Sequence, residues 1–517
     1  MSRTAVLVVH GMGQQRPGAT QRSLGEALAG PDDEWYLAPD RITGRTDTHR
    51  VTIRTPAGDE AHVYEHYWSD RFQDTRLSAV APWLLRLLAS RGLGPRIGGR
   101  SGFVEWAIGI AAVLPYWFLA AASFASSDPT LDGFLDGVPA MGIVLGLFVA
   151  AWAITARLTR SVLAAAGVGA IAGGIAAAAT VDLDLQTAGI GLVLLAWAPL
   201  WLAIGAAMRG MGPIAWVRIL IAVVVAMLLA FSMVEGQFVI GGLPGVLTVL
   251  VVGVWLRHWL GDVARYLDAT PGNAAEADRL RRETTELVTR LSSDKRYRYD
   301  NVVVVAHSQG GFVAYDALVG AFQSWAGSHV LDPEEQAAVH GLDHELASGA
   351  ASPESWSAAV ELLRTRMEAT GEAWPVSAFI TLGSPIGHAA GLLATDAAQL
   401  RKRIEERGLA SCPPHQHGAP PSVAYGTDTG MRLHHTSVFA VTEWVNIAFV
   451  HDLLGGPVTA EGLGGLVRDV SLGDDDFEAT IFDFLRAFPH DAYWSGSRFE
   501  AETERAVALL RDRCGLG

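Results

Sequence analysis

Unbroken apolar runs near both ends of the chain predict the buried strands of a parallel sheet. The clearest run lies in Asn301 to Gly311, NVVVVAHSQGG, where four valines precede a turn with two glycines. β-Branched residues in such a run are typical of a strand that is covered on both faces. Similar runs at Ala5 to Val9 and Val376 to Leu382 predict two more strands. Arg50 to Thr55 and Ala61 to Tyr67 alternate in polarity, which predicts a hairpin or an edge pair.

Helical patterns lie between these runs. Residues 274–291 carry four apolar side chains on one face, which predicts the crossover helix that leads into the valine-rich strand. Phe312 to Val319 has helical composition directly after that strand. Gln323 to Trp374 is polar, mostly helical and long for one connection, so it could form a cap. Arg407 to Ser437, rich in Pro, Gly and His, predicts a flexible surface segment.

A long apolar region separates the two pieces and predicts membrane spans. Its segments are each near the ~20 residues that cross a bilayer. They are Phe103 to Phe124, Val138 to Ala156, Ser161 to Thr180, Thr187 to Met208, Ile214 to Val234 and Phe238 to Leu256. Arginines flank alternate ends of these segments and acidic residues flank the others, which is the positive-inside pattern for six spans.

The pattern therefore predicts three parts: an N-terminal sheet piece over residues 1–100, a six-helix transmembrane insertion over 101–260, and a C-terminal sheet piece over 261–517. An even number of spans returns the chain to the side it left, so both sheet pieces can join one sheet. We expect a multi-pass protein of the cell inner membrane with both termini and the sheet domain in the cytoplasm.

Composition narrows the function. The formal charge of −15 over 517 residues argues against a nucleic-acid partner, because phosphate binding needs clustered Lys and Arg. Only Cys412 and Cys514 are cysteines, which fits a reducing compartment. The start, MSRTAVLVVHGMGQQ, has an apolar run too short for a signal peptide, so we interpret it as a strand.

Ser308 is the candidate nucleophile. It stands between a predicted strand and a predicted helix, with the small residues Ala306 and Gly310 two positions away on either side. This stretch resembles the nucleophile elbow, Gly-x-Ser-x-Gly, of the α/β-hydrolase superfamily, with alanine at the first small position. The resemblance implies an α/β fold with a mostly parallel sheet, helices on both faces, and a lipase-like or esterase-like serine hydrolase activity.

The other elements of a serine hydrolase can be assigned in part. The phrase VVHGMGQQRPG resembles bacterial hydrolases of unassigned substrate, and in lipase-like members a His-Gly turn after the first strand contributes to the oxyanion hole. The resemblance implies that the backbone N–H groups of Met12 and Gln309 hold the oxyanion. A preorganised donor of this kind is worth on the order of a hundredfold in rate.

A serine hydroxyl needs a histidine as base and a carboxylate to orient it, in the chain order Ser, acid, His for this fold. Asp452 follows the predicted strand EWVNIAFV, and His490 follows the last predicted strand, residues 467–472. The phrases WVNIAFVHDLLGG and PHDAYW resemble those that carry the acid and the histidine in lipase-like hydrolases. The competing bases are His388, His434, His435 and His451, and the competing acids are Asp474 to Asp476. Ser384 precedes a proline and is interpreted as a loop residue.

No metal or cofactor is expected. Cys412, His415 and His417 lie close in sequence but lack a fourth ligand for zinc. The sequence thus predicts a membrane-embedded serine hydrolase that cleaves an ester or other acyl bond of a lipid or small acyl substrate. The alternative is a membrane protein whose helical bundle carries the function, with a non-catalytic hydrolase-like domain for regulation or binding.

Overall fold

The chain divides into two compact units. The first comprises Met1–Trp83, Ser90–Gly98 and His258–Gly517, and the second comprises Leu84–Ala89 and Gly99–Arg257. The computed structural model describes only part of the first unit, namely residues 2–11, 16–44, 49–69, 265–267, 271–371, 373–394, 397–450, 452, 455–459, 463–473, 490, 492–495 and 499–517.

An eight-stranded mixed sheet forms the centre of the described fold, in the order β10-β9-β6-β5-β1-β4-β3-β2. The five pairs from β10 to β4 are parallel, and β3 pairs antiparallel with both β4 and β2. The strands are β1 (Arg3–Val9), β2 (Glu34–Pro39), β3 (His49–Arg54), β4 (Glu60–His66), β5 (Asn301–His307), β6 (Val376–Leu382), β9 (Glu443–Phe449) and β10 (Arg468–Leu472). A separate hairpin joins β7 (Ala424–Thr427) to β8 (Gly430–Leu433).

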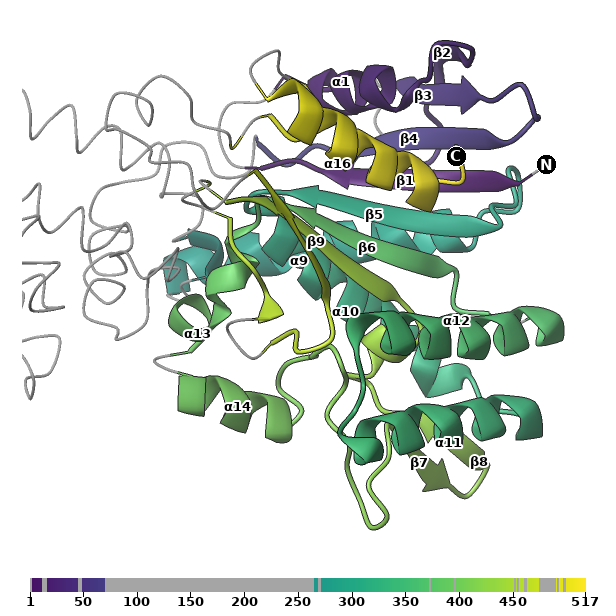
Figure 1. The fold of residues 1–517 in the computed structure, drawn as a ribbon, viewed down its shortest axis with the longest axis vertical. Coiled ribbons are helices and arrows are strands. Elements are labelled where there is room, and N and C mark those ends of the chain that lie inside the picture. The colour runs from purple at the N-terminus through teal and green to yellow at the C-terminus, as the bar shows by residue number, and fades with distance from the viewer. Residues whose placement is uncertain are drawn as a thin grey trace, which may run out of the picture. The chain divides into compact units, whose positions relative to one another are not determined.

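The described helices connect these strands and cover the sheet. They are α1 (Ala19–Leu28), α9 (Pro271–Ser292), α10 (Gly310–Ser328), α11 (Pro333–Ser348), α12 (Pro353–Thr370), α13 (Ala389–Leu392), α14 (Ala397–Glu405) and α16 (Glu500–Arg513), with 3-10 turns η3 (Pro385–His388) and η4 (Val438–Ala440). Figure 1 shows α1 and α16 on one face of the sheet and α9 and α10 on the other.

Alternation along the central strands separates two hydrophobic cores. On β5, Val302 and Val304 pack with residues of α9, α10 and α12, whereas Val303 and Val305 pack with residues of α1 and α16. Successive side chains of a strand point to opposite faces, so an unbroken apolar run supplies both cores. This is why the valine-rich run folds as a central strand.

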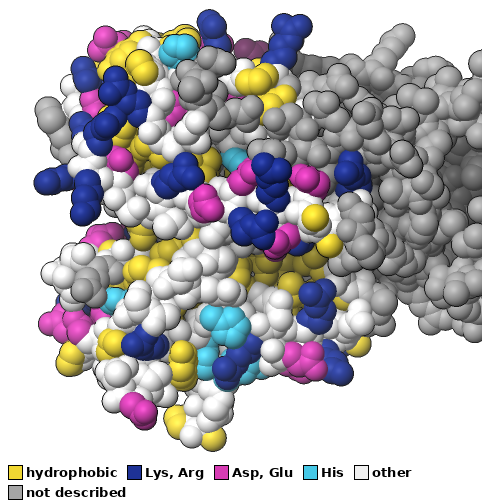
Figure 2. Space-filling model, turned by 180° about the vertical axis from the view of Figure 1, so that it is seen from behind, with side chains coloured by type: hydrophobic (Ala, Val, Ile, Leu, Met, Phe, Trp, Pro, Cys, Tyr) yellow, Lys and Arg dark blue, Asp and Glu magenta, His cyan; other side chains and the backbone are white. Residues whose placement is uncertain are grey.

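The outer surface of α9 is charged. Its exposed face carries three ion pairs, and the two partners of each pair are one helical turn apart. They are Arg279 with Glu283, Arg282 with Asp278, and Arg290 with Glu286. Exposed pairs of this spacing each contribute only a few tenths of a kcal/mol. Seen from behind, the molecule likewise carries basic and acidic side chains in mixture (Figure 2).

Several predicted elements are confirmed, and others were missed. The predicted strands at residues 5–9, 301–307 and 376–382 are β1, β5 and β6, and the predicted hairpin is the antiparallel pair β3–β4. Neither α1 nor the edge strand β2 was predicted from the sequence. The segment Arg407 to Ser437 was predicted to be a flexible surface segment. It contains the β7–β8 hairpin, whose Ala424 and Leu433 are buried.

The predicted six-helix transmembrane bundle requires correction. Across the residues that the structure describes, no helix combines the length and apolar character needed to cross a membrane. The six predicted spans, at residues 103–256, lie outside the described residues. The fold class is therefore corrected to an α/β arrangement with a mixed eight-stranded sheet, and the multi-pass localisation that depended on the bundle is withdrawn. Hydropathy records only that a run is apolar. Apolar residues are also needed in a protein interior, and those of α10 pack in the core against the sheet.

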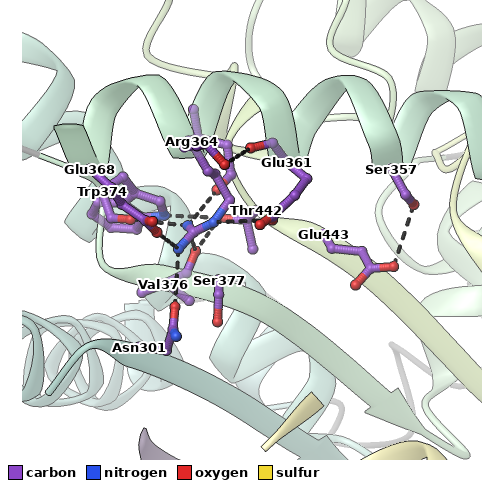
Figure 3. Close-up of polar contacts among 12 residues, drawn as sticks. Asn301, Ser357, Glu361, Arg364, Glu368, Trp374, Val376, Ser377, Thr442 and Glu443 are labelled. Atoms are coloured by element: carbon purple, nitrogen blue, oxygen red, sulfur yellow. Dashed lines mark hydrogen bonds and ion pairs between the residues drawn. The ribbon is translucent and has the colours of Figure 1, made fainter. Parts of the chain in front are cut away.

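The amino ends of β5 and β6 are held by one buried arginine, Arg364 of α12. Its guanidinium donates to the carbonyl oxygens of Trp374 at 3.0 Å, Val376 at 3.1 Å and Val441 at 3.0 Å. It also donates to the side chain of Asn301, the first residue of β5, at 3.2 Å. Figure 3 shows the side chain reaching from α12 toward these groups. The arginine thus satisfies carbonyl groups that the ends of the sheet leave unpaired.

We expect Arg364→Met to lower the free energy of unfolding by about 3–5 kcal/mol, because it removes the buried donor shared by three carbonyl groups, of which that of Val376 also accepts from the Thr442 hydroxyl. Urea unfolding followed by circular dichroism measures this. Arg366→Met is the matched control, since Arg366 lies on the same helix, is exposed, and pairs only with the exposed Glu334 among the contacts described. Equal unfolding free energies for the two variants would contradict the assignment.

Candidate active site

The candidate site lies at the carboxyl ends of the parallel strands. Gly11 follows β1, Ser308 follows β5, Gly383 follows β6 and Asp452 follows β9. β1 and β5 are neighbours at the centre of the sheet, and the chain continues from them in opposite directions, to β4 on one side and to β6 on the other. Such a switch in strand order opens a crevice at the carboxyl ends, where ligands bind in open α/β sheets.

Ser308 occupies a strained turn between β5 and α10. Its φ of +55° lies in the left-handed region, which non-glycine residues seldom adopt, and its side chain is buried. The close approach of neighbouring backbone explains the glycines beside it: a Cβ on Gly310 would lie 2.6 Å from the carbonyl oxygen of His10, and one on Gly311 would meet Ser384. Strain of this kind costs about 1–3 kcal/mol and gathers at functional sites.

The turn after β1 packs directly against Ser308. A Cβ on Gly11 would lie 2.7 Å from Ser308 Cβ and 3.3 Å from its Oγ, so only glycine fits there. His10 holds the turn: its Nε2 accepts a hydrogen bond from the Trp68 backbone N–H at 3.1 Å, and its Nδ1 therefore donates to the Gly11 carbonyl at 2.6 Å. The rings of His10 and Trp68 stack at 5.2 Å.

The two predicted oxyanion donors differ in what the structure shows. Gln309 immediately precedes α10 with helical φ and ψ, so its backbone N–H belongs to the helix end where N–H groups lack intrahelical acceptors. Met12 lies outside the described residues. Its neighbour Gly11 is the part of the His-Gly turn that contacts Ser308.

Asp452 and His490 form a buried pair. His490 Nδ1 lies 2.9 Å from Asp452 Oδ2 and 3.1 Å from Oδ1, and both residues are at most 2% exposed. The Tyr493 hydroxyl donates to Asp452 Oδ2 at 2.7 Å and accepts the Phe449 backbone N–H at 3.1 Å. The carboxylate is therefore fixed by two side chains from the segment that carries His490. Burial beside this carboxylate raises the pKa of Tyr493 well above its ordinary value.

The Ser308 hydroxyl makes no hydrogen bond to any residue in the described part of the chain. The structure thus shows the carboxylate–imidazole pair and the serine at the same end of the sheet, with the contact from His490 to Ser308 not formed. Catalytic hydrogen bonds are often long without substrate and tighten when it binds.

Sequence reasoning did not single out His307, which precedes Ser308 in the chain and packs against His490. Its Nε2 lies 2.8 Å from the His490 carbonyl oxygen, and the two ring centroids are 4.8 Å apart. The only signal in the sequence was its position, one residue before Ser308 at the end of a buried strand.

Three of the competing bases, His388, His434 and His435, lie among the described residues. His388 is buried, neither of its ring nitrogens has a hydrogen-bond partner among the described residues, and burial lowers its pKa to about 4. His434 and His435 belong to the region of the β7–β8 hairpin, where His434 stacks on Tyr425. His451 and Asp474 to Asp476 lie outside the described residues. Ser384 Oγ accepts the Ile386 backbone N–H at 3.3 Å and caps η3, as a loop residue would.

The histidines near Cys412 do not form a metal site in the described chain. His415, His417 and His434 meet through ring contacts at 4.7 and 5.2 Å, and burial lowers the pKa of His417 and of His434 to about 4. Within the described ranges, no group of three or more His, Cys, Asp or Glu side chains is arranged to hold a metal ion.

Comparison with known proteins adds no assignment. No protein-family model, curated protein or solved structure matches the chain. Function must therefore be argued from the residues of the site.

Proposed function

We propose that this protein is a serine hydrolase that cleaves an ester or related acyl bond. Its Ser308 turn resembles the nucleophile elbow of α/β-hydrolases. One observation supports it above the others: a buried serine with φ of +55° and a buried carboxylate–imidazole pair lie at the same end of one sheet. A binding domain has no need of a strained serine at the same end of the sheet as such a pair.

The proposed reaction follows from this geometry. Ser308 Oγ attacks the acyl carbon while His490 Nε2 takes the hydroxyl proton. Asp452 accepts the Nδ1–H hydrogen bond, which leaves Nε2 unprotonated and stabilises the imidazolium that forms. The N–H groups of Gln309 and Met12 hold the oxyanion. The imidazolium then protonates the leaving alcohol, and water, activated by the same histidine, releases the acid and restores the serine.

The substrate class consistent with this site is a lipid or small acyl ester. The proposed steps use only these residues, the substrate and water. The resemblance of the Ser308 turn to lipase-like proteins is the reason to begin with esters rather than amides.

A fluorophosphonate probe tests the proposal directly. The serine oxygen attacks phosphorus, fluoride leaves, and a stable adduct forms that mass spectrometry locates. We expect one adduct, on Ser308, in the full-length protein. Ser324→Ala, an exposed serine of α10, is the matched control and should label like the wild type. An unlabelled wild type, or an adduct that persists in Ser308→Ala, would refute the proposed nucleophile.

A further inference from the structure

His307 ends β5 and is the covalent neighbour of Ser308. Its side chain is 8% exposed and lies on the face of the sheet that α1 and α16 cover, with the rings of Tyr493 and Trp494 at 5.9 and 5.1 Å. These two aromatic residues belong to the segment that carries His490. The imidazole therefore packs between the end of the nucleophile strand and the segment of the proposed base.

A single hydrogen bond joins the two. A carbonyl oxygen can only accept, so His307 Nε2 carries the proton and donates to the His490 carbonyl oxygen at 2.8 Å. Burial is the main cause that lowers the pKa of His307 to about 3, so the ring is neutral and the other nitrogen, Nδ1, is unprotonated above that pH. Nδ1 lies 3.2 Å from the position that a Cβ on Gly11 would take, so the ring also borders the turn after β1.

This bond acts on a part of His490 that Asp452 does not reach. Asp452 accepts from Nδ1 and so fixes the rotation of the His490 ring. His307 holds the backbone carbonyl of the same residue, although the two histidines are 183 positions apart in the chain. Ring and backbone together determine where His490 Nε2 lies relative to Ser308 Oγ. In general, a misplacement of 1 Å between reacting groups can lower a rate about a hundredfold.

We propose that His307 is a positioning residue, which sets the distance between the His490 imidazole and the Ser308 hydroxyl through its hydrogen bond to the His490 backbone. This inference rests on the proposed function. It assigns no contact between His307 and substrate, so its loss should slow the chemical step without weakening substrate binding.

A matched pair of variants tests the bond. In His307→Gln the amide nitrogen takes the place of Nε2 and can donate to the same carbonyl, whereas His307→Met has similar size and no donor. With an ester that the wild type hydrolyses, we expect the methionine variant to lose about tenfold to hundredfold in kcat with KM unchanged. The glutamine variant should stay within about threefold of the wild type, since it keeps the hydrogen bond.

The outcomes separate this inference from the function on which it rests. Circular dichroism and thermal unfolding establish that the variants are folded. If the methionine variant does not fold, His307→Asn, whose shorter amide does not reach the carbonyl, replaces it and should show the same loss. Equal kcat for the variants with and without the donor overturns the positioning role while Ser308→Ala remains inactive. Wild-type turnover by Ser308→Ala would instead overturn the proposed function itself.

Discussion

Ser308→Ala should lower kcat for ester hydrolysis by about 10⁵-fold to 10⁶-fold, the loss found when the nucleophile of a serine hydrolase is removed. Alanine has no hydroxyl to form the acyl-enzyme, so His490 has no proton to accept and only binding and oxyanion stabilisation remain. The expectation depends on the placement of this serine, which is buried in the turn after β5 and contacts Gly11 of the turn after β1.

The measurement is steady-state hydrolysis of a panel of short-chain and long-chain p-nitrophenyl esters and phospholipids by the purified protein. Ser384→Ala is a demanding control, because Ser384 is also buried and lies against Gly311, yet its hydroxyl only caps η3. That variant should keep kcat within a few-fold of the wild type. A Ser308→Ala protein that retains activity, or a Ser384→Ala protein that loses it entirely, would point to a different nucleophile.

Asp452→Asn should lower kcat by about 10⁴-fold with little change in KM, as expected when the acid of a triad becomes an amide. The amide NH₂ cannot accept the Nδ1–H of His490, so the imidazole turns or adopts the tautomer with its proton on Nε2. It then cannot take the proton of Ser308. The Tyr493 hydroxyl, which donates to Asp452 Oδ2 at 2.7 Å, would also face an altered partner.

The same ester assay, run from pH 6 to 9, measures this effect. Asp428→Asn, an exposed aspartate in the turn between β7 and β8, is the matched control and should leave kcat unchanged. If Asp452→Asn kept wild-type kcat, the acid would have to be sought elsewhere, and Asp474 to Asp476 would be the first candidates by chain order. Because the serine remains, this variant should still react slowly with the fluorophosphonate probe.

The sequence by itself located the elements whose signal is local. Four valines and two glycines predicted β5 and the turn that carries Ser308, because residue periodicity and small side chains act over a few positions. Chain order selected Asp452 and His490 among several candidates, and the structure places their side chains 2.9 Å apart. Their catalytic roles, and that of Ser308, stay predictions until the variants are measured.

Hydropathy was a poorer guide to the fold, because it does not tell whether an apolar run lies in a membrane or in a protein interior. The predicted transmembrane bundle was inferred from run length, flanking charge and the even number of spans that joins both sheet pieces, and the described helices include none that could span a membrane. The short edge strand β2, whose Trp35, Tyr36 and Leu37 are exposed, and the β7–β8 hairpin were missed because their few buried residues give no clear period.

Only the tertiary structure decided which distant groups meet. The sheet order brings the ends of β1, β5, β6 and β9 together, and this places Gly11 against Ser308 and Asp452 beside Gly383. The same packing brings His307 within hydrogen-bond distance of the His490 backbone carbonyl. It also brings Arg364 within hydrogen-bond distance of groups at the amino ends of β5 and β6. No local pattern encodes such contacts, because they depend on strand register and on helices that pack across the sheet. The sequence therefore determined the candidate chemistry, and the fold determined the geometry available to it.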